Sequence, residues 1–390
     1  MSVMQRSIHS RILNTGILLL ALAIVGRSAA GHSDNPSHPP GQGDIVIGQS
    51  ADLSGQFAPI SQQFLTGANV YFAQLNAQGG IRGRKLRLLS ADDKGDPELA
   101  VRNTVQFLQN AGAVALFGYT GAQTSMAVQP IVNQRKVLFF APITGNRAVY
   151  STANRHIFTI RASYVNEYEY LFSRLPRIGL KRLAIFDDGT GPQQIAFIKT
   201  LIVNAKAQLV ASESGIGQDI DKIADKLLQA RPDVILIMSV TQKLNVALIK
   251  SLHAKAYLGY LYCNSLICSP LLTNNLEDTA NGLIISQIVP FPWRAATPIV
   301  HEYQHAMLKA GIKKFSYLGL EGFIAAKVLA EGMRRAGPNM TREKLIAAME
   351  GINQTNYKLA GFRINYSATN HHGSTYVDTT TIDKHGTIVH

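Results

Sequence analysis

Two short apolar runs, residues 113–117 and 137–141, constrain the fold more than any other feature of the chain. Each run is bounded by polar residues and has the composition of a buried strand. The segment between them, residues 124–134, has the length of a helix, and a polar loop follows each run. Strand, loop, helix, strand and loop form a parallel α/β unit, and such sheets bind ligands beyond the carboxyl ends of their strands. We therefore expect a binding site in the loops 118–125 and 142–146.

The same alternation continues on both sides of this central stretch and predicts an α/β fold. Helix-length segments separate the expected strands, and the alternation restarts after residue 162. A second series of this kind indicates a second lobe with its own parallel sheet. The further strands are expected at residues 44–50, 85–90 and 156–160 in the first series, and at 182–186, 208–212, 234–238 and 282–288 in the second.

Residues 1–30 have the layout of a cleavable secretory signal. Arg6 and Arg11 precede an apolar run over residues 12–26, and small residues then offer a cleavage site. The apolar run is shorter than a membrane-spanning helix requires. We expect the chain to be exported, with an uncleaved membrane anchor as the alternative. Residues 31–43, rich in Pro, Ser, His and Gly, are expected to form a disordered leader.

The charge pattern argues against a nucleic-acid partner. The formal net charge is +13, yet the basic residues are scattered, with no run longer than a pair and no interleaved aromatic residues. Chains that bind nucleic acid gather their basic residues on one face or segment. We interpret the sequence as a basic, exported globular protein.

The two cysteines of the chain, Cys263 and Cys268, are close in sequence. In an oxidising compartment they are able to close a small loop, and two buried thiols are the alternative. As a metal-binding pair they lack partners nearby. The sequence leaves the choice between disulfide and thiols open.

No catalytic, cofactor or metal motif stands out in the sequence. The loops 118–125 and 142–146 contain hydroxyls, amides and glycines, but no carboxylate, histidine or cysteine. There is no glycine motif for phosphates or dinucleotides and no Gly-x-Ser-x-Gly elbow. His301 and His305 lie one helical turn apart but have no carboxylate at metal-ligand spacing. The sequence predicts a binding protein rather than an enzyme, without cofactor, metal or catalytic residues.

A series of short motifs, taken in order, resembles one known family over residues 44–387. The motifs are Ser54-Gly55, Thr66-Gly67-Ala68, residues 76–86 (NAQGGIRGRKL), Asp92-Asp93 with Asp96-Pro97, Gly118, Ala141-Pro142 and Glu321-Gly322. The chain resembles the type I periplasmic solute-binding proteins of ABC importers, the branched-chain amino acid receptor or leucine-binding protein family. The segments Arg161-Ala-Ser-Tyr, Ser286-Gln-Ile-Val-Pro and Glu321-Gly322 resemble a divergent, less characterised branch of it.

The resemblance implies two Rossmann-like α/β lobes with parallel sheets, joined by a three-strand hinge and closing on a ligand. The first lobe would comprise residues 44–162 with 287–371, and the second lobe residues 163–286 with 372–390. The resemblance also implies a monomer in the periplasm. Its partners would be a small-molecule ligand and an ABC permease of the inner membrane.

In family members that bind amino acids, the loops after the two central strands hold the ligand's carboxylate with backbone N–H groups and hydroxyls. Ala122 stands where the family usually has a serine, and Gly145 where it often has a threonine. Those members hold the ligand's ammonium with an acid and aromatic residues of the second lobe. In the alignment, Ser265 falls near the position of that acid, and Val240 falls near the position of one of the aromatic residues. The resemblance is therefore weakest where an amino acid ligand would be recognised.

A buried ammonium without an anionic partner is costly. Either Asp187, Asp188 or Glu321 replaces the usual acid, or the ligand is not an α-amino acid. We favour the second interpretation, because a carboxylate, an aromatic acid or an amide suits the hydroxyl-rich loops. The candidate ligand-binding residues are Tyr119, Thr120, Ala122, Gln123, Thr124, Ile143, Thr144, Gly145, Asn146, Tyr164, Asp188, Ser239, Ser265 and Glu321.

Three functions remain open from the sequence. The leading hypothesis is the periplasmic component of an ABC import system, which captures a small polar solute that is amino acid-like or a carboxylate or amide. A ligand-sensing receptor that signals to a membrane partner is the alternative, and an α/β enzyme is the third. Tyr119 and Tyr164 either stack on the ligand or fill the lobe interface. Glu321 is either a cleft acid or the first-turn carboxylate of its helix.

Overall fold

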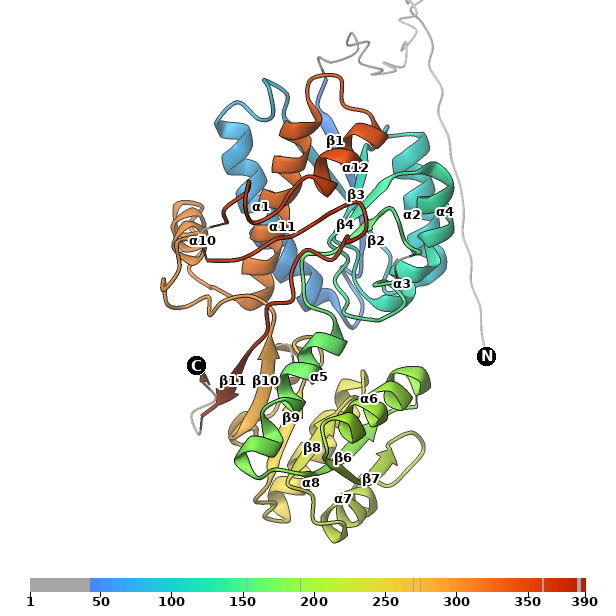
Figure 1. Ribbon diagram of the computed structural model, residues 1–390, viewed down its shortest axis with the longest axis vertical. Helices are drawn as coiled ribbons and strands as arrows, with labels where there is room; N and C mark the ends of the chain where they lie inside the picture. The colour runs from blue at the N-terminus through green and yellow to red at the C-terminus, as the bar shows by residue number, and fades with distance from the viewer. Residues whose placement is uncertain are drawn as a thin grey trace, which may run out of the picture. The chain divides into compact units, whose positions relative to one another are not determined.

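The computed structural model describes residues 43–151, 153–189, 191–268, 270–273, 275–359, 361–383 and 387–390. The expected secretory signal and all but the last residue of the expected leader lie outside the described residues. Strands and helices alternate along the chain, and the strands form two separate sheets (Figure 1). The predicted α/β class with two lobes is confirmed. No helix in the described part of the chain is long and apolar enough to cross a membrane.

The first sheet is entirely parallel, with the strand order β2-β1-β3-β4-β5. The order reverses direction between β1 and β3, and ligands of open parallel sheets bind at such a point. Its strands are β1 (Ile45–Ala51), β2 (Leu86–Asp92), β3 (Ala115–Phe117), β4 (Leu138–Phe140) and β5 (Ile157–Phe158), and its early helices are α1 (Ala58–Ala77), α2 (Pro97–Gln109), α3 (Ala122–Ala127) and α4 (Gln129–Arg135).

The helix expected at residues 124–134 is two short helices, α3 and α4, because of a proline. Pro130 lies in the first turn of α4, and Val128 separates the two helices. A proline has no N–H and clashes with the preceding turn, so it begins a new helix instead of continuing the old one. The prediction of a single helix was therefore wrong, although the strand–helix–strand order holds.

The second sheet has the order β12-β11-β10-β9-β8-β6-β7, with only β11 and β12 antiparallel to their neighbours. Its hydrophobic core lies on both faces of the parallel strands. The strands are β6 (Arg182–Asp187), β7 (Gln208–Ser214), β8 (Val234–Ile237), β9 (Tyr260–Cys263), β10 (Leu283–Gln287), β11 (Asp378–Ile382) and β12 (Ile388–Val389). The helices are α5 (Tyr164–Phe172), α6 (Pro192–Asn204), α7 (Ile220–Gln229), α8 (Gln242–Ala254) and the short α9 (Pro270–Thr273). Two single-turn 3₁₀ helices occur at Leu175–Ile178 and Glu277–Ala280.

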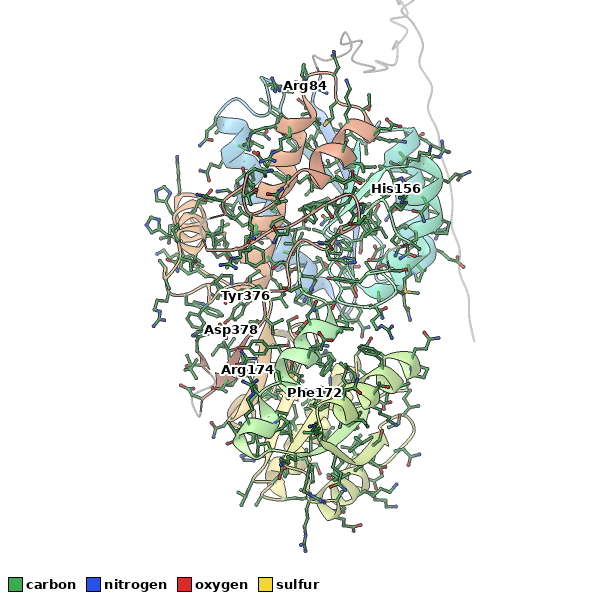
Figure 2. The ribbon with its side chains drawn as sticks, viewed as in Figure 1. Arg84, His156, Phe172, Arg174, Tyr376 and Asp378 are labelled. Carbon is green, nitrogen blue, oxygen red and sulfur yellow. A yellow bond between two sulfur atoms is a disulfide. The ribbon has the colours of Figure 1, made fainter. Side chains whose placement is uncertain are left out.

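Three connections join the two sheets, and they are paired with one another. The chain passes to the second lobe after β5, returns after β10 and passes again before β11. Strands β10 and β11 are antiparallel neighbours, with Gln287 opposite Asp378. Thr159, just after β5, forms a parallel bridge with His372. Where the third connection enters β11, Tyr376 Oη donates to Asp378 Oδ2 at 3.2 Å (Figure 2).

Three late helices, α10 (Pro298–Lys309), α11 (Tyr317–Ala336) and α12 (Arg342–Glu350), belong to the first lobe. Helix α11 lies directly against α1 (Figure 1). A Cβ atom on Gly67 of α1 would overlap the carbonyl oxygen of Gly319, and one on Gly322 would overlap the carbonyl oxygen of Phe64. The two backbones therefore touch at these glycines, which explains two of the sequence motifs.

Replacing Gly322 by alanine is expected to lower the free energy of unfolding by about 1–3 kcal/mol, because the added Cβ forces the packed helices apart. Urea unfolding followed by circular dichroism measures the loss. Gly351→Ala is the matched control: its φ is −78°, and the nearest atom to an added Cβ would be 3.5 Å away. An equal loss in both variants would contradict the contact between the helices.

Candidate functional site

A cavity of about 1490 Å³ lies where loops at the carboxyl ends of strands from both sheets meet. The first sheet contributes the loops after β3 and β4. The second sheet contributes the loops after β6, β8 and β9, together with the start of α5. The location agrees with the expectation drawn from the central stretch. The candidate residues on the cavity wall are Thr120, Ala122, Gln123, Thr124, Ile143, Thr144, Asn146, Tyr164 and Asp188.

The first-lobe wall is built around the turn that begins α3. Gly121 precedes the helix with φ of 94°, a conformation that favours glycine. Thr124 Oγ1 donates to the carbonyl oxygen of Thr120 at 2.5 Å, and Ser125 Oγ donates to that of Gly121 at 2.6 Å. The hydroxyl of Thr120 pairs with Ser61 Oγ at 2.7 Å. These hydroxyls hold the turn in shape, and no side chain caps the N–H groups of the first turn of α3.

Tyr119 and Gly145, both candidates from the sequence, do not lie on the cavity wall. The Tyr119 side chain is fully buried, with its hydroxyl 2.9 Å from Thr104 Oγ1 and its ring against Phe139. The Tyr164 ring covers Gly145 so closely that a Cβ there would overlap it. The threonine that the family often has at Gly145 would not fit beside this tyrosine.

Asp188 anchors the loop after β8 on the second-lobe wall. Its Oδ2 accepts hydrogen bonds from the backbone N–H groups of Val240 (2.7 Å) and Thr241 (2.9 Å). The hydroxyls of Ser239 and Thr241 also donate to it, both at 3.0 Å. Ser239 is buried behind the wall and does not line the cavity. The structure thus assigns both residues a part in shaping the loop.

Ser265 and Glu321 do not line the cavity but meet behind its wall, in a polar cluster around the buried Arg161. Arg161 is 1% exposed, and its Nη2 donates to Ser265 Oγ at 2.6 Å. Its Nη1 lies 3.7 Å from Glu321 Oε1. Glu167 accepts from the N–H of Ser265 at 2.8 Å, from Ser265 Oγ at 3.0 Å and from Ser286 Oγ. The three segments that mark the divergent branch therefore meet at one point.

The cluster holds two carboxyl groups and one guanidinium, which is ion-paired with Glu321 and hydrogen-bonded to the serine that contacts Glu167. Burial raises the pKa of Glu167 and of Glu321 above the ordinary value, and the Arg161 charge partly offsets this. Glu167 has hydrogen-bond donors from Ser265 and Ser286 that stabilise its charge. Glu321 is ion-paired to Arg161 at a distance too long for a hydrogen bond. The charge of Glu321 is thus stabilised by the ion pair alone, and that of Glu167 by hydrogen bonds from two serines.

Cys263 and Cys268 form a disulfide, which resolves the choice that the sequence left open. The bridge joins the end of β9 to the loop that carries Ser265. Asn264, inside the same loop, accepts from the N–H groups of Leu266 (3.1 Å) and Ile267 (2.9 Å). A covalent link and an Asx turn together fix this part of the cavity wall.

Sequence reasoning missed several residues of the cavity wall. Arg147 directly follows the expected loop 142–146, so extending that loop by one residue would have found it. Tyr168 lies about one helical turn after Tyr164 on α5. His372 had no local signal, because only the third connection brings it to the cavity.

The sequence model of the family described as periplasmic binding protein matches residues 44–387. The chain belongs to this family. The Leu/Ile/Val-binding protein of Escherichia coli is 30% identical over 99 residues, which is 25% of this chain and 27% of that relative. The matched segment thus spans about a quarter of the curated relative's length.

Solved structures match this periplasmic binding protein over nearly their whole length. A substrate-binding periplasmic protein from Ralstonia solanacearum is 27% identical with a TM-score of 0.78, covering 89% of this chain and 99% of that one. A branched-chain amino acid ABC transporter protein from Thermus thermophilus with bound valine has a TM-score of 0.79 at 16% identity, covering 90% and 95%. The predicted fold of a type I periplasmic binding protein is confirmed.

Glu321→Gln is expected to remove part of the pH dependence of stability, so that the wild type loses stability relative to the variant between pH 5 and pH 8. The comparison concerns this slope, because removing the carboxylate also removes the ion pair with the buried Arg161 and lowers the whole stability curve of the variant. Because burial raises the pKa of Glu321, the folded protein binds a proton more readily than the unfolded chain. Wild-type stability therefore falls as pH rises from the unfolded pKa through the folded one, by at most about 1.4 kcal/mol per pH unit for one group. The glutamine stays neutral and is spared this loss.

Urea unfolding of both proteins from pH 5 to pH 8 measures this effect. Glu169→Gln is the control, because Glu169 is exposed on the same helix as Glu167. Its stability curve should follow that of the wild type. Parallel curves for Glu321→Gln and wild type across the whole range would refute a raised pKa at Glu321.

Proposed function

We propose that the protein is the solute-binding component of an ABC import system, capturing a small polar solute between its two lobes. The observation that carries the proposal is the cavity itself, whose walls come from loops at the carboxyl ends of both sheets. Ligands of parallel sheets bind at that edge, and binding across two lobes links occupancy to lobe closure. Most polar side chains of the wall carry hydroxyls or amides, which bind solutes, and the two carboxylates there, Asp187 and Asp188, accept hydrogen bonds from their own lobe.

The lobe boundaries expected from the sequence belong to the same proposal. Residues 44–162 with 287–371 form the first lobe, and residues 163–286 with 372–390 form the second. The strand membership of the two sheets supports this division. The chain is exported through its first thirty residues and works in the periplasm as a monomer that presents its solute to an inner-membrane permease. It acts as a carrier and has no catalytic role.

The solute is a carboxylate or an amide rather than an α-amino acid. An ammonium in the cavity needs an anionic partner. Of the three acids that could replace the usual one, Glu321 is paired with Arg161 and does not line the cavity. Asp188 Oδ2 already accepts four hydrogen bonds from its own lobe. Asp187 Oδ1 accepts from the N–H of Gly189 at 2.6 Å, which leaves Asp187 as the acid of the wall whose pairing with an ammonium the amino acids in the screen below test.

The test is a thermal-shift screen of the purified chain against amino acids, aliphatic and aromatic carboxylates, amides and nucleobases. A ligand at one hundred times its Kd stabilises the folded state by about 2.7 kcal/mol, which gives a clear shift in Tm. We expect the largest shifts from compounds that lack an α-ammonium. If leucine, isoleucine or valine gives the largest shift, an acid of the cavity holds the ammonium and the assignment of solute class is wrong.

A further inference from the structure

Arg147 brings a positive charge to the cavity from the first lobe. It lies in the connection between β4 and β5, directly after residues 142–146, and its exposed side chain lines the cavity. Its guanidinium carbon lies 4.1 Å from the ring centroid of Phe197, which belongs to α6 of the second lobe. A cation over an aromatic face is attracted to it, so this contact holds the guanidinium between the lobes. The contact leaves the N–H groups at the edge of the guanidinium able to bind a ligand.

No acid neutralises this charge within the described part of the chain. The ion pairs found there, all with nitrogen and oxygen within 4.0 Å, do not include Arg147. The acids on the cavity wall are Asp187 and Asp188, and each accepts hydrogen bonds from its own lobe. Among the described residues of the wall, Arg147 therefore carries a positive charge with no carboxylate within ion-pair distance.

The second lobe presents a further electropositive group to the same space. Helix α6, which carries Phe197, begins at Pro192 on the cavity wall, with neither a side-chain cap nor an acid in its first turn. The uncapped N-terminus of a helix carries a partial positive charge. In that turn the Gln194 side chain, also on the wall, has a buried Nε2 without a hydrogen-bond partner. Both lobes thus contribute electropositive groups to the cavity wall.

We propose that Arg147 binds an anionic group of the solute, so that the solute is a carboxylate with an apolar body and not an uncharged amide. This inference rests on the proposed solute-binding function and narrows it. The guanidinium matches a carboxylate with two parallel hydrogen bonds. Phe197 acts as a positioning residue for Arg147. Met238, Val240 and Ile267 on the opposite wall accommodate the apolar body.

The experiment compares acids with their own amides by isothermal titration calorimetry. The probes are 3-phenylpropanoate and 3-phenylpropanamide, and 4-methylpentanoate and 4-methylpentanamide, with phenylalanine and leucine for comparison. The proteins are the wild type, Arg147→Met, which keeps the length of the side chain without its charge, and Arg155→Met. Arg155 is the matched control because it is exposed on the same lobe but does not line the cavity.

We expect the wild type and Arg155→Met to bind an acid at least about tenfold more tightly than its amide. This ratio of affinities corresponds to the contribution of one hydrogen bond between charged groups. Arg147→Met should lose this preference while keeping the wild-type Tm. Equal binding of acid and amide by the wild type, or an acid preference that survives in Arg147→Met, overturns the inference. If the wild type binds an amide best, the anionic assignment fails and the proposed solute-binding function stands. If it binds an amino acid best, the exclusion of α-amino acids proposed above fails with it, and the solute-binding function still stands. If it binds none of these probes and nothing in the broader thermal-shift screen, the proposed function fails as well.

Discussion

The buried guanidinium of Arg161 is the interaction on which the arrangement of the two lobes depends. A charge removed from water is tolerated only when partners surround it. Here the partners come from α11 of the first lobe, through Glu321, and from the loop after β9 of the second lobe, through Ser265. Glu167 completes the cluster through Ser265 and Ser286. Arg161 Nε and Nη1 have no hydrogen-bond partner, so the ion pair with Glu321 and the hydrogen bond to Ser265 are the contacts that compensate its burial. Neither lobe alone supplies both, so burying Arg161 constrains how the connecting segments lie.

The second constraint acts within the first lobe. Gly67 and Gly322 let α1 and α11 meet backbone to backbone, and this contact places Glu321, the neighbour of Gly322, inside the protein. A side chain at either glycine would move α11 away from α1 and carry Glu321 away from Arg161. Close packing and the polar cluster therefore depend on one another, although the two contacts are chemically different.

Much of the fold could be predicted because its signals are local. The short apolar runs and the loops after them identify the parallel sheets and the edge at which the cavity lies. The break at Pro130 was also readable from the sequence, although the segment was interpreted as one helix. The placement of Ser265 and Glu321 was not readable, because each pairs with Arg161 from more than one hundred residues away. A polar residue near the expected site looks the same in sequence whether it faces a ligand or a buried arginine.

The pairing of the three connections limits how the lobes are able to move. Because β10 and β11 share a ladder and Thr159 is bridged to His372, backbone hydrogen bonds hold the connections side by side. Separating the connections would break these bonds, whereas rotating about them together leaves the bonds in place. We therefore expect the lobes to rotate about the paired connections more readily than they slide, so that their loops keep the same alignment each time they approach a solute.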